Sequence, residues 1–217
     1  MNLISRSILN RVLSVVLAAN LLVAACAIFY FSHSLSSNRE YHALASEKMV
    51  HALETESILN RFKTQVQEWK NVLIRGSDDE QRAKYWRQFQ EQEAGIQQAL
   101  GTLVPQLPEG KARSLLNRFQ DAHRRMGQAY RAGFKDFVAA DYDHREGDQA
   151  VQGIDREPAQ LIEEASTLIR EQALADASSL NESVTRNTTL IGIIMLAAIL
   201  AGTLLCILVL SRTVVRP

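Results

Sequence analysis

The sequence predicts an all-α protein, an up-and-down four-helix bundle whose first and fourth helices are continuous with two transmembrane helices. Three observations support this prediction. Two uncharged segments are each long enough to cross a bilayer, apolar residues between them recur at helical spacing, and glycine and proline interrupt that spacing at a few places. A chain of 217 residues leaves room for one such domain.

Two apolar segments, residues 12–31 and 190–210, contain no charged side chain. A helix of about 20 apolar residues spans the roughly 30 Å hydrocarbon core of a bilayer. A signal peptide is the alternative for the first segment, but its apolar run is longer than the usual core of about 7 to 15 residues. We therefore expect two transmembrane helices.

Basic residues flank the two segments at the chain ends, and neither terminal tail contains an acidic residue. By the positive-inside rule, residues 1–11 form a cytoplasmic tail, residues 211–217 are also cytoplasmic, and residues 32–189 lie outside. The basic residues that set this orientation are Arg6, Arg11, Arg212 and Arg216.

The charge balance of the external region and the positions of the cysteines exclude two classes of protein. Four of the 24 basic residues lie in the tails, which leaves 20 against 24 acids outside. A mildly acidic domain is not expected to bind nucleic acid. Both cysteines, Cys26 and Cys206, lie in the apolar segments, so no disulfide framework supports the external domain.

Apolar residues between the two segments recur every three to four positions, as on one face of an α-helix. Four such stripes follow one another along the chain. Because a single stripe cannot bury its apolar face alone, we expect four helices to pack into a bundle. The stripes are Leu59, Phe62, Val66, Trp69 and Leu73; Phe89, Ile96, Leu100 and Leu103; Leu116, Phe119, His123, Met126, Tyr130, Phe134 and Phe137; and Leu161, Ala165 and Leu168, then more weakly Leu180 and Val184.

Turn-forming residues separate the stripes. Gly76 is expected to end the first helix in a left-handed conformation, and SDDE at residues 77–80 offers a capping box for the second. Two prolines within residues 104–110 are expected to end the second helix. The third break is predicted within residues 139–148, so that the fourth helix begins near Gly147.

Three stretches resemble parts of bacterial methyl-accepting chemotaxis proteins. VQEWKNVLIRG at residues 66–76 resembles a segment near the end of the first sensor helix of such receptors, and VQGIDREP at 151–158 resembles its counterpart near the start of the fourth. SRTVVRP at 211–217 resembles the opening of a HAMP domain, their helical coupling module. The order of transmembrane helix, external bundle and transmembrane helix is also similar.

The resemblance implies a homodimeric chemoreceptor of the bacterial inner membrane, with residues 32–189 as a periplasmic sensor domain. The second transmembrane helix would pass the signal to a cytoplasmic HAMP and signalling module. The chain ends at Pro217, before the methylated, kinase-coupling hairpin, so we expect either a piece of a receptor or a protein without its output. The alternatives are the sensor portion of a histidine kinase or of a cyclic-dinucleotide enzyme, and a structural or partner-binding membrane protein without a ligand.

The stretch around Trp69 is the predicted ligand-binding region. Arg61 and Arg75 lie along one edge of the apolar stripe of the first helix, and Lys63 and Lys70 lie along the other. Guanidinium and ammonium groups beside an indole can hold a small anion, so a small anionic solute is the predicted ligand. The alternative is that Trp69 is simply a core residue and that the cations are solvated or favour the helix dipole.

Asp155 and Arg156, at the start of the fourth helix, are expected to lie at the same level of the bundle. Adjacent residues cannot share a helix face, so Asp155 is expected to bridge to a basic residue of the first helix. Pro158 either kinks the fourth helix, which frees a carbonyl, or marks its first turn. The complete predicted ligand-binding set is Trp69, Lys70, Arg75, Asp155 and Arg156.

Other chemistry is not expected. The acidic stretch at residues 141–148 includes His144, but its spacing matches neither an EF-hand loop nor a paired-histidine helix, so no metal is predicted. No haem-attachment motif is present, and no cofactor is predicted. No serine, cysteine or carboxylate pair has a recognisable catalytic setting, so the sequence does not indicate an enzyme.

Overall fold

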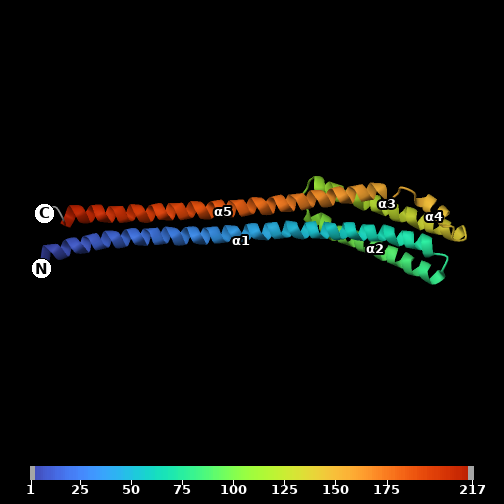
Figure 1. Ribbon diagram of the computed structural model, residues 1–217, viewed down its shortest axis with the longest axis horizontal. Coiled ribbons are helices and arrows are strands. Elements are labelled where there is room, and N and C mark those ends of the chain that lie inside the picture. Colours follow the sequence, from blue (N-terminus) through green and yellow to red (C-terminus); the bar gives the residue numbers. More distant parts are fainter. Residues whose placement is uncertain (1–2, 215–217) are drawn as a thin grey trace. The chain divides into compact units, whose positions relative to one another are not determined.

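The computed structural model describes residues 3–214, and within this range it leaves undescribed some side chains toward the two chain ends. The described residues form five helices and no strand, so the predicted all-α class is confirmed (Figure 1). The helices are α1 (Leu3–Arg75), α2 (Asp79–Gln106), α3 (Lys111–Ala139), α4 (His144–Val151) and α5 (Arg156–Val214). The predicted cytoplasmic tail at 1–11 and the HAMP-like segment at 211–217 lie partly outside the described residues.

The chain divides into two compact units. The bundle unit comprises residues 45–176, and the terminal unit comprises residues 1–44 and 177–217. The bundle unit therefore contains the outer part of α1, all of α2, α3 and α4, and the first part of α5.

One apolar core fills the bundle unit, and the predicted stripes supply most of it. On α2 all four predicted residues are buried, and on α3 six of the seven are buried, with Phe134 half-buried. On α1 the face is centred slightly differently, because Ile58, Val72 and the polar Gln65 are fully buried while Leu59 and Val66 are half-buried. The helical bundle is thus confirmed, and its up-and-down arrangement stays a prediction.

The turn between α1 and α2 follows the prediction except at Gly76. Asp78 is the N-cap of α2 and its carboxylate accepts a hydrogen bond from Gln81 N at 2.9 Å. Gly76 is not among the residues with positive φ. Glycine is required there by space instead, because a Cβ would lie 2.7 Å from the ring of Phe137 and 2.2 Å from the carbonyl oxygen of Val72.

Two helix boundaries differ from the prediction. Pro105 lies inside the last turn of α2 rather than ending it, and the chain turns at residues 107–110. After α3 the sequence predicted one long helix from about Gly147, whereas the structure has the separate helix α4, a turn at residues 152–155, and then α5. Pro158 lies in the first turn of α5, where a missing N–H costs no helical hydrogen bond, so it marks the helix start.

The terminal unit contains the apolar ends of α1 and α5. Among the described residues, one stretch, within α5 between Arg156 and Leu204, is long and apolar enough to cross a membrane by length and composition. The apolar stretch found in α1 is shorter, Val23–Ser32. Large apolar side chains such as Leu17 and Phe29 are exposed in the apolar end of α1. The structure agrees with the second predicted span, and the first span stays a prediction.

Candidate ligand-binding site

Trp69 lies in an aromatic cluster of the bundle core. Its indole packs edge to face against Tyr130, with ring centroids 5.0 Å apart, and against Trp86 and Phe89 at 6.3 and 6.4 Å. The side chain is 2% exposed, and its Nε1–H has no hydrogen-bond partner. Trp69 therefore contacts core residues of α2 and α3 rather than solvent.

The two edges of the α1 stripe face different neighbours. Arg61 Nη1 donates to Gln92 of α2 at 3.4 Å, and Arg75 donates to the hydroxyl of Tyr85, also on α2, while its guanidinium lies over the Tyr85 ring. On the other edge, Lys63 pairs with Glu163 of α5 at 3.6 Å. The predicted site residues Lys70 and Arg75 thus belong to opposite edges.

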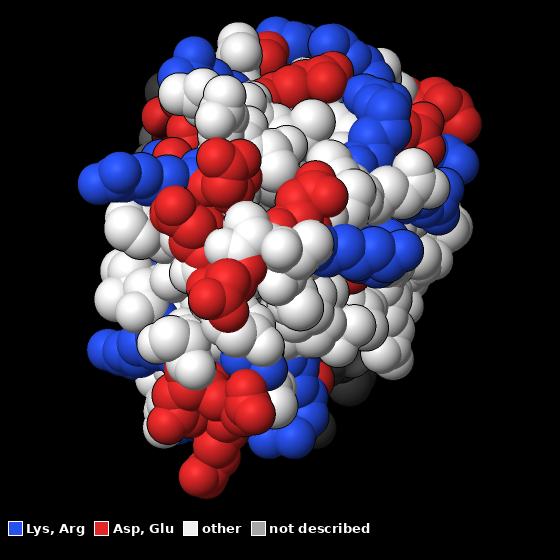
Figure 2. Space-filling view, turned by 90° about the vertical axis from the view of Figure 1, so that its right-hand side faces the viewer, with Lys and Arg blue, Asp and Glu red and all other residues white. Residues whose placement is uncertain are grey.

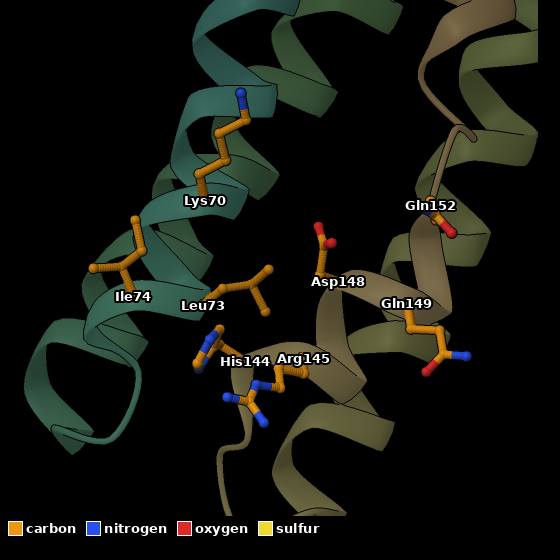
Figure 3. Close-up of a pocket in the computed structure, with 8 residues that line it drawn as sticks. All are labelled: Lys70, Leu73, Ile74, His144, Arg145, Asp148, Gln149 and Gln152. Carbon is orange, nitrogen blue, oxygen red and sulfur yellow. The ribbon is translucent and has the colours of Figure 1, made fainter.

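Lys70 lines a pocket between the end of α1 and the short helix α4. The pocket has a volume of about 650 Å³, within the usual range of small-molecule sites. Figure 3 shows Lys70, Leu73 and Ile74 on the α1 side and the other lining residues on the α4 side. The α4 side comprises His144, Arg145, Asp148, Gln149 and Gln152.

Close helix packing holds α4 beside the pocket. A Cβ on Gly133 of α3 would lie 2.7 Å from Cγ1 of Val151, and one on Gly147 would lie 2.5 Å from Cδ2 of Leu73. Asp143 caps α4, since its carboxylate accepts from Arg145 N at 2.9 Å. The buried Val151 and Gly147 therefore set the position of the polar face of α4 that borders the pocket.

The charges in this pocket do not pair with one another. Among the ion pairs between described residues, none includes Lys70, Arg145 or Asp148. At the rim, His144 Nδ1 lies 4.0 Å from Asp143 Oδ1. Two cations and one carboxylate are thus presented to solvent at the same opening.

Asp155 is connected to Trp69 through Tyr130. Burial raises the pKa of the Tyr130 phenol, and the carboxylates of Asp155 and Asp148 raise it further. The Tyr130 ring is the one that packs on Trp69. No ion pair among the described residues joins Asp155 to Lys70 or Arg75, and Arg156 is exposed beside Gly153, whose φ is +75°.

A buried polar network crosses the core below Trp69. His123 Nε2 donates to Gln65 Oε1 at 2.7 Å, and its Nδ1 accepts from Gln97 Nε2, also at 2.7 Å. Gln97 Oε1 in turn accepts from Arg124 Nε at 3.1 Å. Burial lowers the pKa of His123 to about 4, so the imidazole is neutral, as these bonds require.

The end of the bundle unit that carries the α1–α2 and α3–α4 turns displays both signs of charge. Figure 2 faces this end and shows Asp and Glu side chains in groups, with Lys and Arg side chains between them. Within the described part of the chain, no group of three or more His, Cys, Asp or Glu residues has an arrangement that can hold a metal ion.

Comparison with known proteins gives one informative match. The chain is 38% identical over 157 residues to the methyl-accepting chemotaxis protein CtpH of Pseudomonas aeruginosa. The aligned segment covers 72% of this chain and 28% of that relative. The resemblance predicted from the sequence is thereby confirmed. No protein-family model matches the chain, and no solved structure matches it significantly.

Proposed function

We propose, from the similarity of this chain to a methyl-accepting chemotaxis protein, that it is the sensor region of a transmembrane chemoreceptor. The match over 72% of the chain is the observation that supports the proposal most strongly. The match covers 28% of the relative, so this chain corresponds to only part of that protein's length. The receptor would be a homodimer in the bacterial inner membrane, spanning it twice, with residues 32–189 in the periplasm and a HAMP-like segment in the cytoplasm.

The proposed ligand is a small anionic solute bound in the outer part of the bundle. Two basic residues of α1 support this part of the proposal: Lys70 on the side of α4, and Arg75 on the side of α2. Arg156 is exposed at the start of α5, next to Asp155. A solute that binds one arrangement of α1 and α5 more tightly than another shifts the equilibrium between them by that difference in affinity. Displacement of α5 would then carry the signal to the HAMP-like segment.

A ligand screen tests the receptor function. The full chain is reconstituted in lipid nanodiscs and its melting temperature is measured with amino acids, organic acids and inorganic anions. A solute that binds the native state alone raises that temperature in proportion to RT ln(1 + [L]/Kd). A screen without any stabilising solute favours the structural or partner-binding alternative.

Charge removal tests the proposed site. Arg75→Gln and Arg156→Gln are expected to weaken calorimetric affinity for the solute found in the screen while leaving the melting temperature of the free protein nearly unchanged. Arg87→Gln is the matched control, because Arg87 is also an exposed arginine but lies on α2. Unchanged affinity in both test variants would reject the site assignment and leave the receptor function standing.

A further inference from the structure

We propose that the pocket between α1 and α4 is where the solute binds, and that the solute is a zwitterion. Its anionic group is taken by Lys70 and Arg145, and its ammonium group by Asp148. This inference rests on the proposed receptor function and revises its ligand and its site. The pocket is not lined by Arg75 or Arg156, so on this inference Arg75→Gln and Arg156→Gln leave the affinity for the solute unchanged.

The pairing of charges elsewhere in the bundle unit makes this pocket unusual. Where helices of the bundle meet, opposite charges at the surface generally approach each other closely. The pairs between helices are Lys63–Glu163 at 3.6 Å, Lys111–Glu164 at 2.8 Å, Arg125–Glu157 at 3.2 Å and Arg131–Glu93 at 2.7 Å, together with Lys48–Asp176. Lys70 of α1 and Asp148 of α4 border the same pocket and form no such pair.

Figure 3 shows how these groups are held apart. Lys70 extends along α1, the Asp148 carboxylate stands between the two helices, and the Arg145 guanidinium lies beside His144 at the lower rim. Because α4 is packed against α1 and α3 through Gly147 and Val151, it cannot simply move to close the gap. The backbone positions that carry these exposed charged groups are therefore set by packing, which lowers the cost of arranging the groups around a ligand that supplies the complementary charges.

The combination of charges selects against simple ions. A solute with only an anionic group gains from Lys70 and Arg145 but is repelled by Asp148. A solute with only an ammonium group gains from Asp148 and is repelled by the two cations. A zwitterion satisfies all three groups with charge-assisted hydrogen bonds.

The remaining lining residues suit the middle of such a molecule. The side chains of Gln149 and Gln152 can each donate and accept hydrogen bonds. Leu73 and the exposed Ile74 provide an apolar wall on the α1 side, against which methylene groups can pack. The ligand is therefore expected to carry a short apolar connection between its two charged groups.

The pocket also has a structural route to the core. Asp148 lies close enough to the Tyr130 phenol to affect its ionisation, and the Tyr130 ring packs on Trp69 of α1. An ammonium group bound by Asp148 changes the charge beside this aromatic contact. Binding can therefore act on α1 at two points, directly at Lys70 and through Tyr130 at Trp69.

A matched series of probes tests the proposal on the full chain in nanodiscs. The probes are ω-amino carboxylates with one to five methylene groups between the charges, the corresponding unsubstituted carboxylates, and the corresponding alkylamines. We expect at least one ω-amino carboxylate to bind about tenfold or more tightly than both of its singly charged counterparts, measured by calorimetry at low salt.

Three variants and one control assign the charges. Asp148→Asn is expected to remove the preference for the zwitterion over the carboxylate, whereas Lys70→Met and Arg145→Met weaken both by about tenfold or more. Lys135→Met changes an exposed lysine of α3 that does not line the pocket, and it should have no effect.

The outcomes separate this inference from the proposed function. Equal affinity for carboxylate and zwitterion, a preference that survives Asp148→Asn, or no binding of any ω-amino carboxylate overturns the inference. If organic acids or inorganic anions still raise the melting temperature in those cases, the receptor function stands. If no solute of any class binds, both fail together.

Discussion

The rings of Trp69 and Tyr130 meet nearly at right angles, at an interplanar angle of 86°, and join α1 to α3 at the level of the candidate site. Tyr130 in turn lies near the carboxylates of Asp148 and Asp155. Trp69 of α1 thus packs on the same tyrosine of α3 whose pKa is raised by the carboxylate of Asp155, the acid before α5.

The indole N–H of Trp69 contributes little to stability, whereas its ring contributes much. Because Nε1 has no hydrogen-bond partner, Trp69→Phe removes no bond and is expected to change the free energy of unfolding by about 1 kcal/mol or less. Trp69→Ala is expected to cost about 3–5 kcal/mol, since it leaves a cavity among Trp86, Phe89 and Tyr130. Urea unfolding followed by the fluorescence of Trp86 measures both. A loss as large for phenylalanine as for alanine would reveal an acceptor for the indole.

Acid destabilises the bundle through His123. Its pKa is lowered to about 4 in the folded protein, against about 6.5 when unfolded, so the unfolded chain binds the additional proton. This contribution to stability is therefore constant above about pH 6.5 and falls between pH 6.5 and 4, by about 3 kcal/mol in all at about 1.4 kcal/mol per pH unit.

The measurement compares unfolding free energies at several pH values in that window. His123→Gln is expected to flatten the pH dependence whatever its absolute stability, whereas His144→Gln, at an exposed position, should leave the slope unchanged. An unaltered slope in His123→Gln would assign the acid sensitivity to other groups.

Two glycine substitutions are expected to change the stability of the protein in opposite directions. In Gly133→Ala the new methyl would lie 2.7 Å from the β-branched Val151, which has little rotamer freedom, so a loss of about 1–3 kcal/mol and a displaced α4 are expected. In Gly101→Ala, on α2, the methyl meets no atom within 4 Å and helix propensity favours a gain of about 0.5–1 kcal/mol. Thermal unfolding measures both changes. A stabilising Gly133→Ala would show that α4 can move away from α3 at low energetic cost.

Arg82 connects the two turns at the outer end of the bundle. Its guanidinium donates to the carbonyl of Gly76 at 2.7 Å, pairs with Asp79 at 2.6 Å, and lies 4.2 Å from the ring centre of Tyr142, whose φ is +65°. Arg82→Met is expected to cost about 1–2 kcal/mol and to speed amide exchange in residues 140–143. Arg82→Lys should not restore protection from amide exchange, because an ammonium group lacks the planar array of N–H donors with which the guanidinium contacts several partners. Full protection in the lysine variant would mean that charge alone suffices.

The sequence predicted the long helices well because their apolar periodicity extends over many turns. Ten of the eleven stripe residues predicted on α2 and α3 are buried, and Trp69 and Phe62 lie in the core as the spacing required. Gln65 was missed because a polar side chain does not contribute to an apolar pattern, although it is fully buried beside His123.

The candidate pocket was only partly predictable for a related reason. Helix α4 has eight residues, of which only Gly147 and Val151 are buried, so its apolar pattern is too short to distinguish it from a loop. Lys70 belongs to the predicted ligand-binding set, whereas Arg145 and Asp148 do not. Arg75 was correctly placed on one edge of α1, but nothing in its own sequence context indicated Tyr85 as its partner.

The bonds of His123 to Gln65 and Gln97 limit how the bundle can move. Sliding α1 along α3 by one helical turn, about 5.4 Å, would leave the buried imidazole of His123 without its hydrogen bond to Gln65. That hydrogen bond tolerates only about half an ångström of lengthening. Large axial displacements of α1 relative to α3 within the bundle are thereby disfavoured. Tilting or rotation of the helices as a group preserves the hydrogen bonds of His123 and is compatible with the fold.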